Sequence, residues 1–269
     1  MKHILLSLIL FLSAATVSGG MTELAVRDDP PVPQLARVFE KKVAEISAVK
    51  ALMVKQTNRF RKEEGLEPVE LNKALSETSQ HFADFMARTK KYGHTADGRL
   101  PSERAQAQGY QYCMVSENIA YQFRLEGFST EELAKVFVTG WKKSPEHRKN
   151  MVDPGFVEIG VGVAQDPTSG RYFAVQMFGR PKSMGIRFQL ANKSGQTVYY
   201  TLSNRESRHE YSLPPQAIQT HERCLPTILE LSDMEMKTTI SDGTCYTVGS
   251  GKRGELTLTT GSLRDRGRP

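Results

Sequence analysis

The stretch that decides the fold is Ser144-Pro145-Glu146-His147-Arg148-Lys149-Asn150-Met151, which lies past the middle of a chain of 269 residues. A serine followed by a proline is typical of a helix start. The serine hydroxyl can cap a free backbone N–H, and proline fits the first helical position because it has no N–H to leave unpaired. The stretch therefore predicts a short helix.

Upstream, the apolar pattern predicts three longer helices. Apolar residues recur at helical spacing in residues 46–60 and again in residues 71–86. Ser129 followed by Glu132 forms a capping-box pattern, which opens a helix that runs to about Trp141, the single tryptophan. Because Trp141 ends an amphipathic helix, we expect it in the core.

Downstream, two segments rich in β-forming residues predict neighbouring strands. Residues 155–163 and 171–179 each read as a strand, and residues 167–170 supply the turn between them. Helices on both sides of such a short sheet give an α-β-α sandwich over residues 45–181. In one of the strands, Gly160 and Gly162 predict close backbone packing.

The sequence changes character after Pro181. Residues 186–190 and 198–202 alternate apolar and polar side chains around a turn-like stretch, residues 192–195, which predicts a β-hairpin. Further short alternating runs follow. The predicted fold class is therefore α+β, with the α-β-α sandwich followed by a small all-β module at residues 184–263.

Both ends of the chain lie outside these folded parts. Lys2 and the apolar residues 4–17, followed by small residues, predict a signal peptide at residues 1–19. An uncleaved N-terminal anchor is the alternative. Residues 20–44 are a predicted linker, and residues 264–269 form a basic tail. We expect a secreted, periplasmic or cell-envelope protein without a transmembrane span in its mature form.

The formal net charge of +6 is modest, and the basic residues are spread along the helical segments. Basic surfaces attract anionic envelope polymers and lipid headgroups, but a solvated surface has the same composition. Aromatic residues do not interleave with the basic ones, so nucleic acid is not an expected partner. The oligomeric state is not predicted.

Several segments together resemble the bacterial branch of the CAP family (cysteine-rich secretory proteins, antigen 5 and pathogenesis-related proteins). The resemblance covers about residues 45–179. It rests on Ser116-Glu117-Asn118-Ile119-Ala120, on Gly140-Trp141 with the opening stretch, and on residues 153–163 and 172–179. It implies the CAP fold and a cleft that holds histidines and glutamates. Family members of this kind resemble lipid- or sterol-binding proteins.

Matched motif by motif, the resemblance places His94, Glu117 and His147 in this cleft. Many eukaryotic family members have a second glutamate three residues after the tryptophan, where this chain has Ser144. Glu146 could substitute for that glutamate, although it directly precedes His147. The family's set of four is therefore incomplete here.

The three cleft residues allow more than one chemistry. Two imidazoles and a carboxylate, from His94, His147 and Glu117, form a ligand set that a divalent metal such as zinc accepts. A glutamate beside a histidine can also serve as a general acid–base pair. The same side chains could instead only hold the cleft together by hydrogen bonds.

Three functions remain open on this basis. The favoured one is a non-catalytic module that binds a ligand, such as a lipid, or an envelope partner through the cleft and the adjacent helices. The second is a metal-dependent hydrolase that uses His94, Glu117 and His147. The third is a structural protein that docks through its β module.

The three cysteines would meet an oxidising compartment after export. Cys224 and Cys245 both fall in the small β module, which buries little apolar surface for its length and gains from a covalent tie. We therefore expect a Cys224–Cys245 disulfide and a free, buried Cys113.

Overall fold

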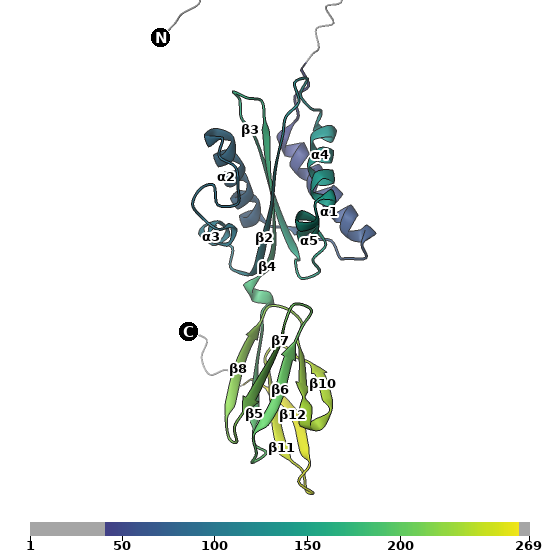
Figure 1. Cartoon of the computed structure of the whole chain (residues 1–269), viewed down its shortest axis with the longest axis vertical. Helices are drawn as coiled ribbons and strands as arrows, with labels where there is room; N and C mark the ends of the chain where they lie inside the picture. The colour runs from purple at the N-terminus through teal and green to yellow at the C-terminus, as the bar shows by residue number, and fades with distance from the viewer. Residues whose placement is uncertain (1–40, 264–269) are drawn as a thin grey trace, which may run out of the picture. The chain divides into compact units, whose positions relative to one another are not determined.

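The computed structural model describes residues 41–263 of the chain, which form five α-helices and twelve β-strands (Figure 1). The predicted signal peptide, most of the predicted linker and the basic tail lie outside the described residues. The predicted limits of the two folded parts, 45–181 and 184–263, stay predictions.

A four-stranded sheet forms the centre of the first part, in the strand order β1-β3-β4-β2. Strand β4 runs antiparallel to both of its neighbours, and β1 runs parallel to β3. The long strand β2 therefore lies at one edge. The bounds are β1 (Glu70–Leu71), β2 (Tyr112–Gln122), β3 (Glu158–Gln165) and β4 (Tyr172–Pro181).

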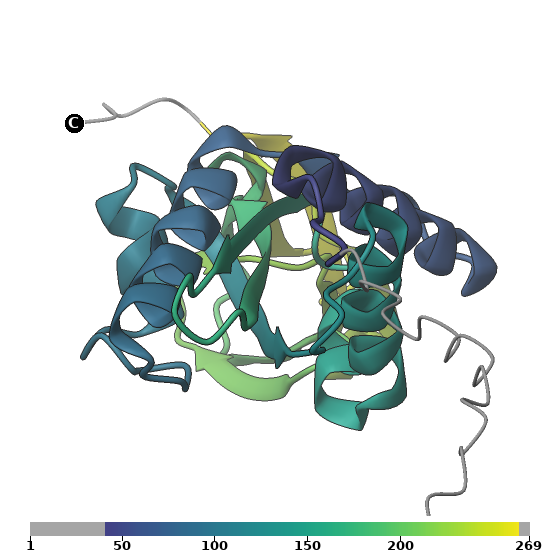
Figure 2. The ribbon, with the colours of Figure 1, turned by 90° about the horizontal axis from the view of Figure 1, so that it is seen from above.

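Helices cover both faces of this sheet, as the two views in Figures 1 and 2 show. Helices α2 (Lys73–Thr89) and α3 (Pro101–Ala107) lie on one face. Helices α1 (Ile46–Glu63), α4 (Thr130–Lys143) and α5 (Pro145–Met151) lie on the other. Each face has its own cluster of buried apolar side chains. The predicted α-β-α sandwich is confirmed.

The capping box and the proline signal act as predicted, whereas the Ser144 side chain makes no capping hydrogen bond at the start of α5. Ser129 and Glu132 form the capping box that opens α4, and Pro145 is the first residue of α5. Trp141 is buried in the core. The short helix α3 escaped prediction, although its first residue, Pro101, is the same kind of start signal.

Two glycines set the distance between α2 and β3. A Cβ atom on Gly160 would collide with the backbone at Leu75, and one on Gly162 would collide with the backbone at Ser79. Both partners belong to α2, so the helix can approach the strand this closely only where side chains are missing. The predicted close packing is confirmed.

The second part contains two further four-stranded sheets. Their strand orders are β10-β9-β6-β7 and β12-β11-β5-β8. One cluster of buried apolar side chains draws on both sheets. The bounds are β5 (Ile186–Asn192), β6 (Val198–Ser203), β7 (Arg208–Leu213), β8 (Ile218–Arg223), β9 (Ile228–Leu231), β10 (Met236–Thr239), β11 (Thr244–Ser250) and β12 (Leu256–Ser262).

The predicted hairpin between residues 186–190 and 198–202 is wrong. Both segments are strands, but β5 pairs with β8 and β11, whereas β6 pairs with β7 and β9. The segment between them carries the chain from one sheet to the other. Alternation shows only that one face of each strand is buried, and here the two strands bury those faces in a core shared by both sheets.

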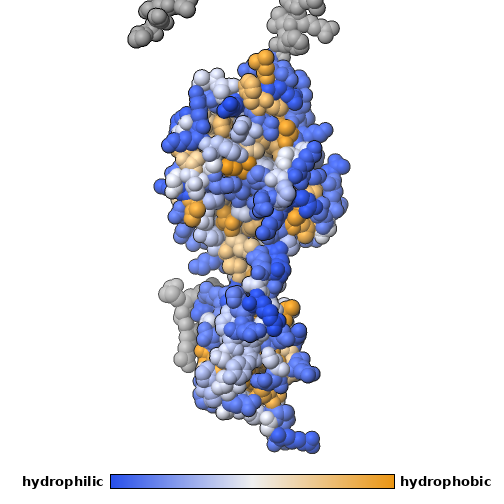
Figure 3. Space-filling model, viewed as in Figure 1, coloured by the Kyte–Doolittle hydropathy of each residue, from blue (hydrophilic) through white to orange (hydrophobic). Residues whose placement is uncertain are grey.

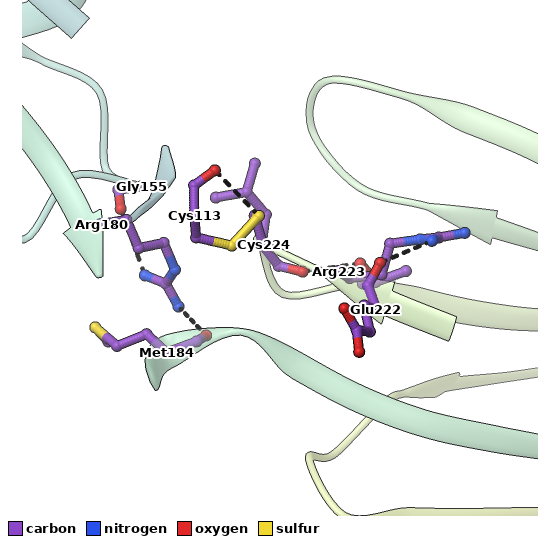
Figure 4. Close-up of a disulfide and its surroundings, with 9 residues drawn as sticks. Cys113, Gly155, Arg180, Met184, Glu222, Arg223 and Cys224 are labelled. Atoms are coloured by element: carbon purple, nitrogen blue, oxygen red, sulfur yellow. Dashed lines mark hydrogen bonds between the residues drawn. A yellow bond between two sulfur atoms is a disulfide. The ribbon is translucent and has the colours of Figure 1, made fainter. Parts of the chain in front are cut away.

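The predicted disulfide is also wrong. Cys113 at the start of β2 is bonded to Cys224 just after β8, with 5.5 Å between their Cα atoms, and Cys245 is free (Figure 4). Strand β5 separates β8 from β11, which carries Cys245. Two strand spacings are roughly 9–10 Å, too far for a disulfide to bridge.

The face drawn in Figure 3 is mainly hydrophilic and is interrupted by small hydrophobic patches. Within residues 41–263, none of the helices has the length and apolar character needed to cross a membrane.

Candidate functional site

Glu117 lies in the middle of β2 with its side chain almost completely buried, 1% exposed. Each of its carboxylate oxygens has a partner. Oε1 lies 2.8 Å from Nδ1 of His94, and Oε2 accepts a hydrogen bond of 2.7 Å from Nη2 of Arg104. The carboxylate is thus held by two cationic or hydrogen-bonding side chains from outside its own strand.

Arg104, which sequence reasoning missed, connects the elements around Glu117. Its side chain is 6% exposed and comes from α3. Besides Glu117, it donates to Asp97 Oδ1 at 2.8 Å and to the backbone carbonyl of His94 at 2.9 Å. Its guanidinium carbon lies 3.6 Å from the centre of the Phe82 ring. Nothing in the sequence around Arg104 indicated that this arginine would be buried.

His94 lies between α2 and α3, and its side chain is 48% exposed. Because Glu117 accepts at Nδ1, the neutral ring carries its proton there and leaves the Nε2 lone pair available. No hydrogen bond to Nε2 occurs within residues 41–263. Glu117 and Arg104 therefore orient an imidazole whose second nitrogen is free.

His147 is half-buried and lies on α5, which covers the face of the sheet opposite to α2 and α3. Burial lowers the pKa of His147, and the nearby His94 lowers it further. The ring is therefore neutral at pH 7. Glu146 is exposed and raises this pKa only slightly against these effects; in the described part of the chain it makes no hydrogen bond or ion pair.

With this geometry established, the chain can be compared with known proteins. Residues 54–178 match the family model described as the cysteine-rich secretory protein family, CAP. Residues 54–178 form a CAP domain. An uncharacterized protein of Bacillus subtilis, YkwD, is 29% identical over 149 residues; the match spans 55% of this chain and half of that relative's length.

Solved structures similar to this chain include two bacterial proteins. One is an extracellular protein with an SCP domain from Bacillus anthracis, at 22% identity and a TM-score of 0.43, with 50% of this chain and 41% of that chain covered. The other is an outer surface protein of Borrelia burgdorferi, at 20% identity and a TM-score of 0.43, with 50% and 93% covered.

In this CAP domain, a buried amide network supports the site from the opposite face of β2. The Asn118 side chain donates to the carbonyl of His147 at 3.1 Å and to Gln176 at 3.0 Å. It accepts from Asn150 at 2.8 Å, and Gln176 donates to Thr57 at 2.9 Å. The network ties α5, and with it His147, to the edge strand next to Glu117.

The structure does not provide the predicted three-ligand metal site. Within residues 41–263 no group of three His, Cys, Asp or Glu side chains is placed to share a metal ion. Both oxygens of Glu117 are already taken, by His94 and Arg104. Glu117 therefore fits as the residue that orients His94 and not as a metal ligand.

Proposed function

We propose that this protein is an exported, non-catalytic CAP module that binds an amphiphilic ligand at His94 and His147. The observation that carries the proposal is the occupied carboxylate of Glu117, whose oxygens both hold neighbouring side chains. A carboxylate in this state positions an imidazole, and with a side chain that is only 1% exposed it has little contact with water. The site thus presents two imidazole rings to a ligand.

The surroundings of His94 support an amphiphilic ligand. Tyr92 and Tyr121 stand edge to face with ring centres 5.1 Å apart, and each is 47% exposed. Burial raises the pKa of Tyr92, as does Glu117 nearby, so this ring lies beside the site. Imidazole nitrogens can bind a polar headgroup while aromatic faces contact an apolar body. A lipid of the cell envelope has this chemistry.

The competing function, metal-dependent hydrolysis, lacks support in this geometry. The three-ligand set is absent from residues 41–263. In the same part of the chain, no serine or cysteine is hydrogen-bonded to the His94 or His147 ring, so an activated nucleophile is also missing.

Binding of a fluorescent fatty acid, cis-parinaric acid, tests the proposal. We expect saturable binding to the wild type and a Kd about tenfold higher for His94→Ala, which loses one hydrogen bond to the charged headgroup. His209→Ala is the control, since His209 is exposed on β7.

Hydrolysis of an ester substrate, measured with and without zinc chloride, tests the competing hydrolase function. Zinc-dependent turnover that disappears in His94→Ala would establish the hydrolase instead. Equal fatty-acid affinity in wild type and His94→Ala would also overturn the proposed binding site.

A further inference from the structure

A separate cavity of about 220 Å³ lies between α2 and α3, behind the residues that hold Glu117. Three arginines from three segments line it: Arg88 from the last turn of α2, Arg99 from the connection to α3, and Arg104 from α3 itself. His81 also lines the cavity. Neither His94 nor His147 is part of this lining.

The charges of this cavity are not balanced. Asp97 is the acidic residue in the lining, and it is already bonded to Arg104. Arg88 and Arg99 make no ion pair with any residue in 41–263. The Arg104 Nε atom is buried and has no hydrogen-bond partner in the described structure. The cavity thus has two exposed arginines without acidic partners in the described part of the chain, next to the buried Arg104.

One wall of the cavity is aromatic. Phe82 and Phe85 both line it, and their rings stack with centres 6.2 Å apart. The Arg104 guanidinium lies over Phe82. Such a wall favours a flat apolar body over a fully hydrated inorganic ion. The volume is below that of pockets for drug-sized ligands, so the ligand must be small.

We infer that this cavity is a second binding site, for a small organic oxyanion carried on a flat apolar body. The planar guanidinium of arginine matches the oxygens of phosphate and carboxylate groups. A bound oxyanion would therefore give Arg88 and Arg99 the acidic partner that they lack within residues 41–263. The apolar body would lie against Phe85, which is partly exposed, because Phe82 is buried beneath the Arg104 guanidinium. Arg104 also donates a hydrogen bond to Glu117, which orients His94. Ligand binding in the cavity should therefore change the surroundings of the His94 ring.

Isothermal titration calorimetry of the folded protein with phenyl phosphate and with inorganic phosphate, at constant ionic strength, tests this inference. We expect one phenyl phosphate per chain, bound at least about fivefold more tightly than inorganic phosphate because of the aromatic wall. Arg88→Gln and Arg99→Gln should each raise the Kd for phenyl phosphate about tenfold. The His94 imidazole signals in NMR should shift during the titration.

The matched control is Arg59→Gln, because Arg59 is an exposed arginine on α1, on the opposite face of the sheet. Its Kd should equal that of the wild type. An equal loss of affinity in Arg59→Gln would show unspecific charge attraction and overturn the inference. So would unchanged affinity in Arg88→Gln and Arg99→Gln with circular dichroism like that of the wild type, or the absence of binding by the wild type. The proposed ligand site at His94 is tested independently by His94→Ala.

Discussion

Glu117 illustrates how the surroundings of a residue decide its role. The carboxylate is buried, and burial of a charge is costly unless a counter-charge and hydrogen bonds offset it. Arg104 supplies both at 2.7 Å, and Asp97 accepts a further hydrogen bond from the same guanidinium. Three segments are thereby tied together around the backbone of His94. The family resemblance implies that Glu117 is a cleft residue, and in the structure its carboxylate holds the side chains of His94 and Arg104 in place.

The buried histidine His221 makes the β region sensitive to acid. It is 5% exposed, and its Nε2 shares a 2.8 Å hydrogen bond with the Tyr200 hydroxyl. Burial, followed by the positive charge of Arg223, lowers the pKa of His221 to about 4. An unfolded histidine has a pKa of about 6.5, so the folded state binds fewer protons between these values. Stability is therefore fully present above pH 6.5 and is lost as the pH falls toward 4.

We predict that this histidine contributes about 3 kcal/mol of unfolding free energy at pH 7 relative to pH 4, from a shift of about 2.5 pKa units. Urea unfolding at pH 7 and pH 4.5 of the wild type and of His221→Gln measures it. The variant should lose clearly less stability on acidification than the wild type. Both proteins have the same carboxylates, so the difference between them reports on His221 alone. His209→Gln, at an exposed site, should behave as the wild type does. Parallel losses in wild type and His221→Gln would contradict the prediction.

At the scale of elements, the contact between α2 and β3 is set by missing side chains. We predict that Gly162→Ala lowers the unfolding free energy by about 1–3 kcal/mol, because a methyl group would force the helix backbone at Ser79 away from the strand. Thermal or urea unfolding measures the change.

The control for that substitution is Gly140→Ala. Gly140 is exposed within α4 and has no atom within 4 Å of the added methyl group. Alanine has the better helix propensity there, so this variant should be about 0.5–1 kcal/mol more stable than the wild type. A Gly162→Ala protein that is as stable as the wild type would show that α2 can move at no cost.

At the scale of the whole molecule, the disulfide joins β2 of the CAP domain to the end of β8, 111 residues further along the chain. We predict that Cys113→Ser with Cys224→Ser lowers stability by roughly 5 kcal/mol in the chain-entropy model, since the bond closes a long loop in the unfolded state. Thermal unfolding of the oxidised wild type and of the double variant checks this, and Cys245→Ser should leave the midpoint unchanged.

Peptide mapping without reductant checks the pairing itself. It should yield Cys113 linked to Cys224, with Cys245 alkylated after denaturation. A linked Cys224–Cys245 peptide would contradict the structure. A bond of this kind persists in oxidising compartments, which is consistent with secretion.

Local patterns in the sequence were sufficient for helices α1, α2, α4 and α5 and for strands β3 and β4 of the first part. Serine at Ser129 and the Ser144-Pro145 step mark helix starts because caps act within one turn of backbone. Gly160 and Gly162 indicated a close approach because only the loss of a side chain permits it. The family motifs brought His94 and Glu117 together as predicted, at 2.8 Å.

Long-range partners were decided only by the tertiary structure. Alternation identified β5 and β6 as strands but could not assign each to its sheet, and the order of strands then removed Cys245 from the reach of Cys224. Arg104 became part of the site because α3 packs beside β2, which no neighbouring residue encodes. Caps and periodicity depend on residues a few positions apart. Pairing of strands and of buried charges depends on which surfaces meet once the cores have formed.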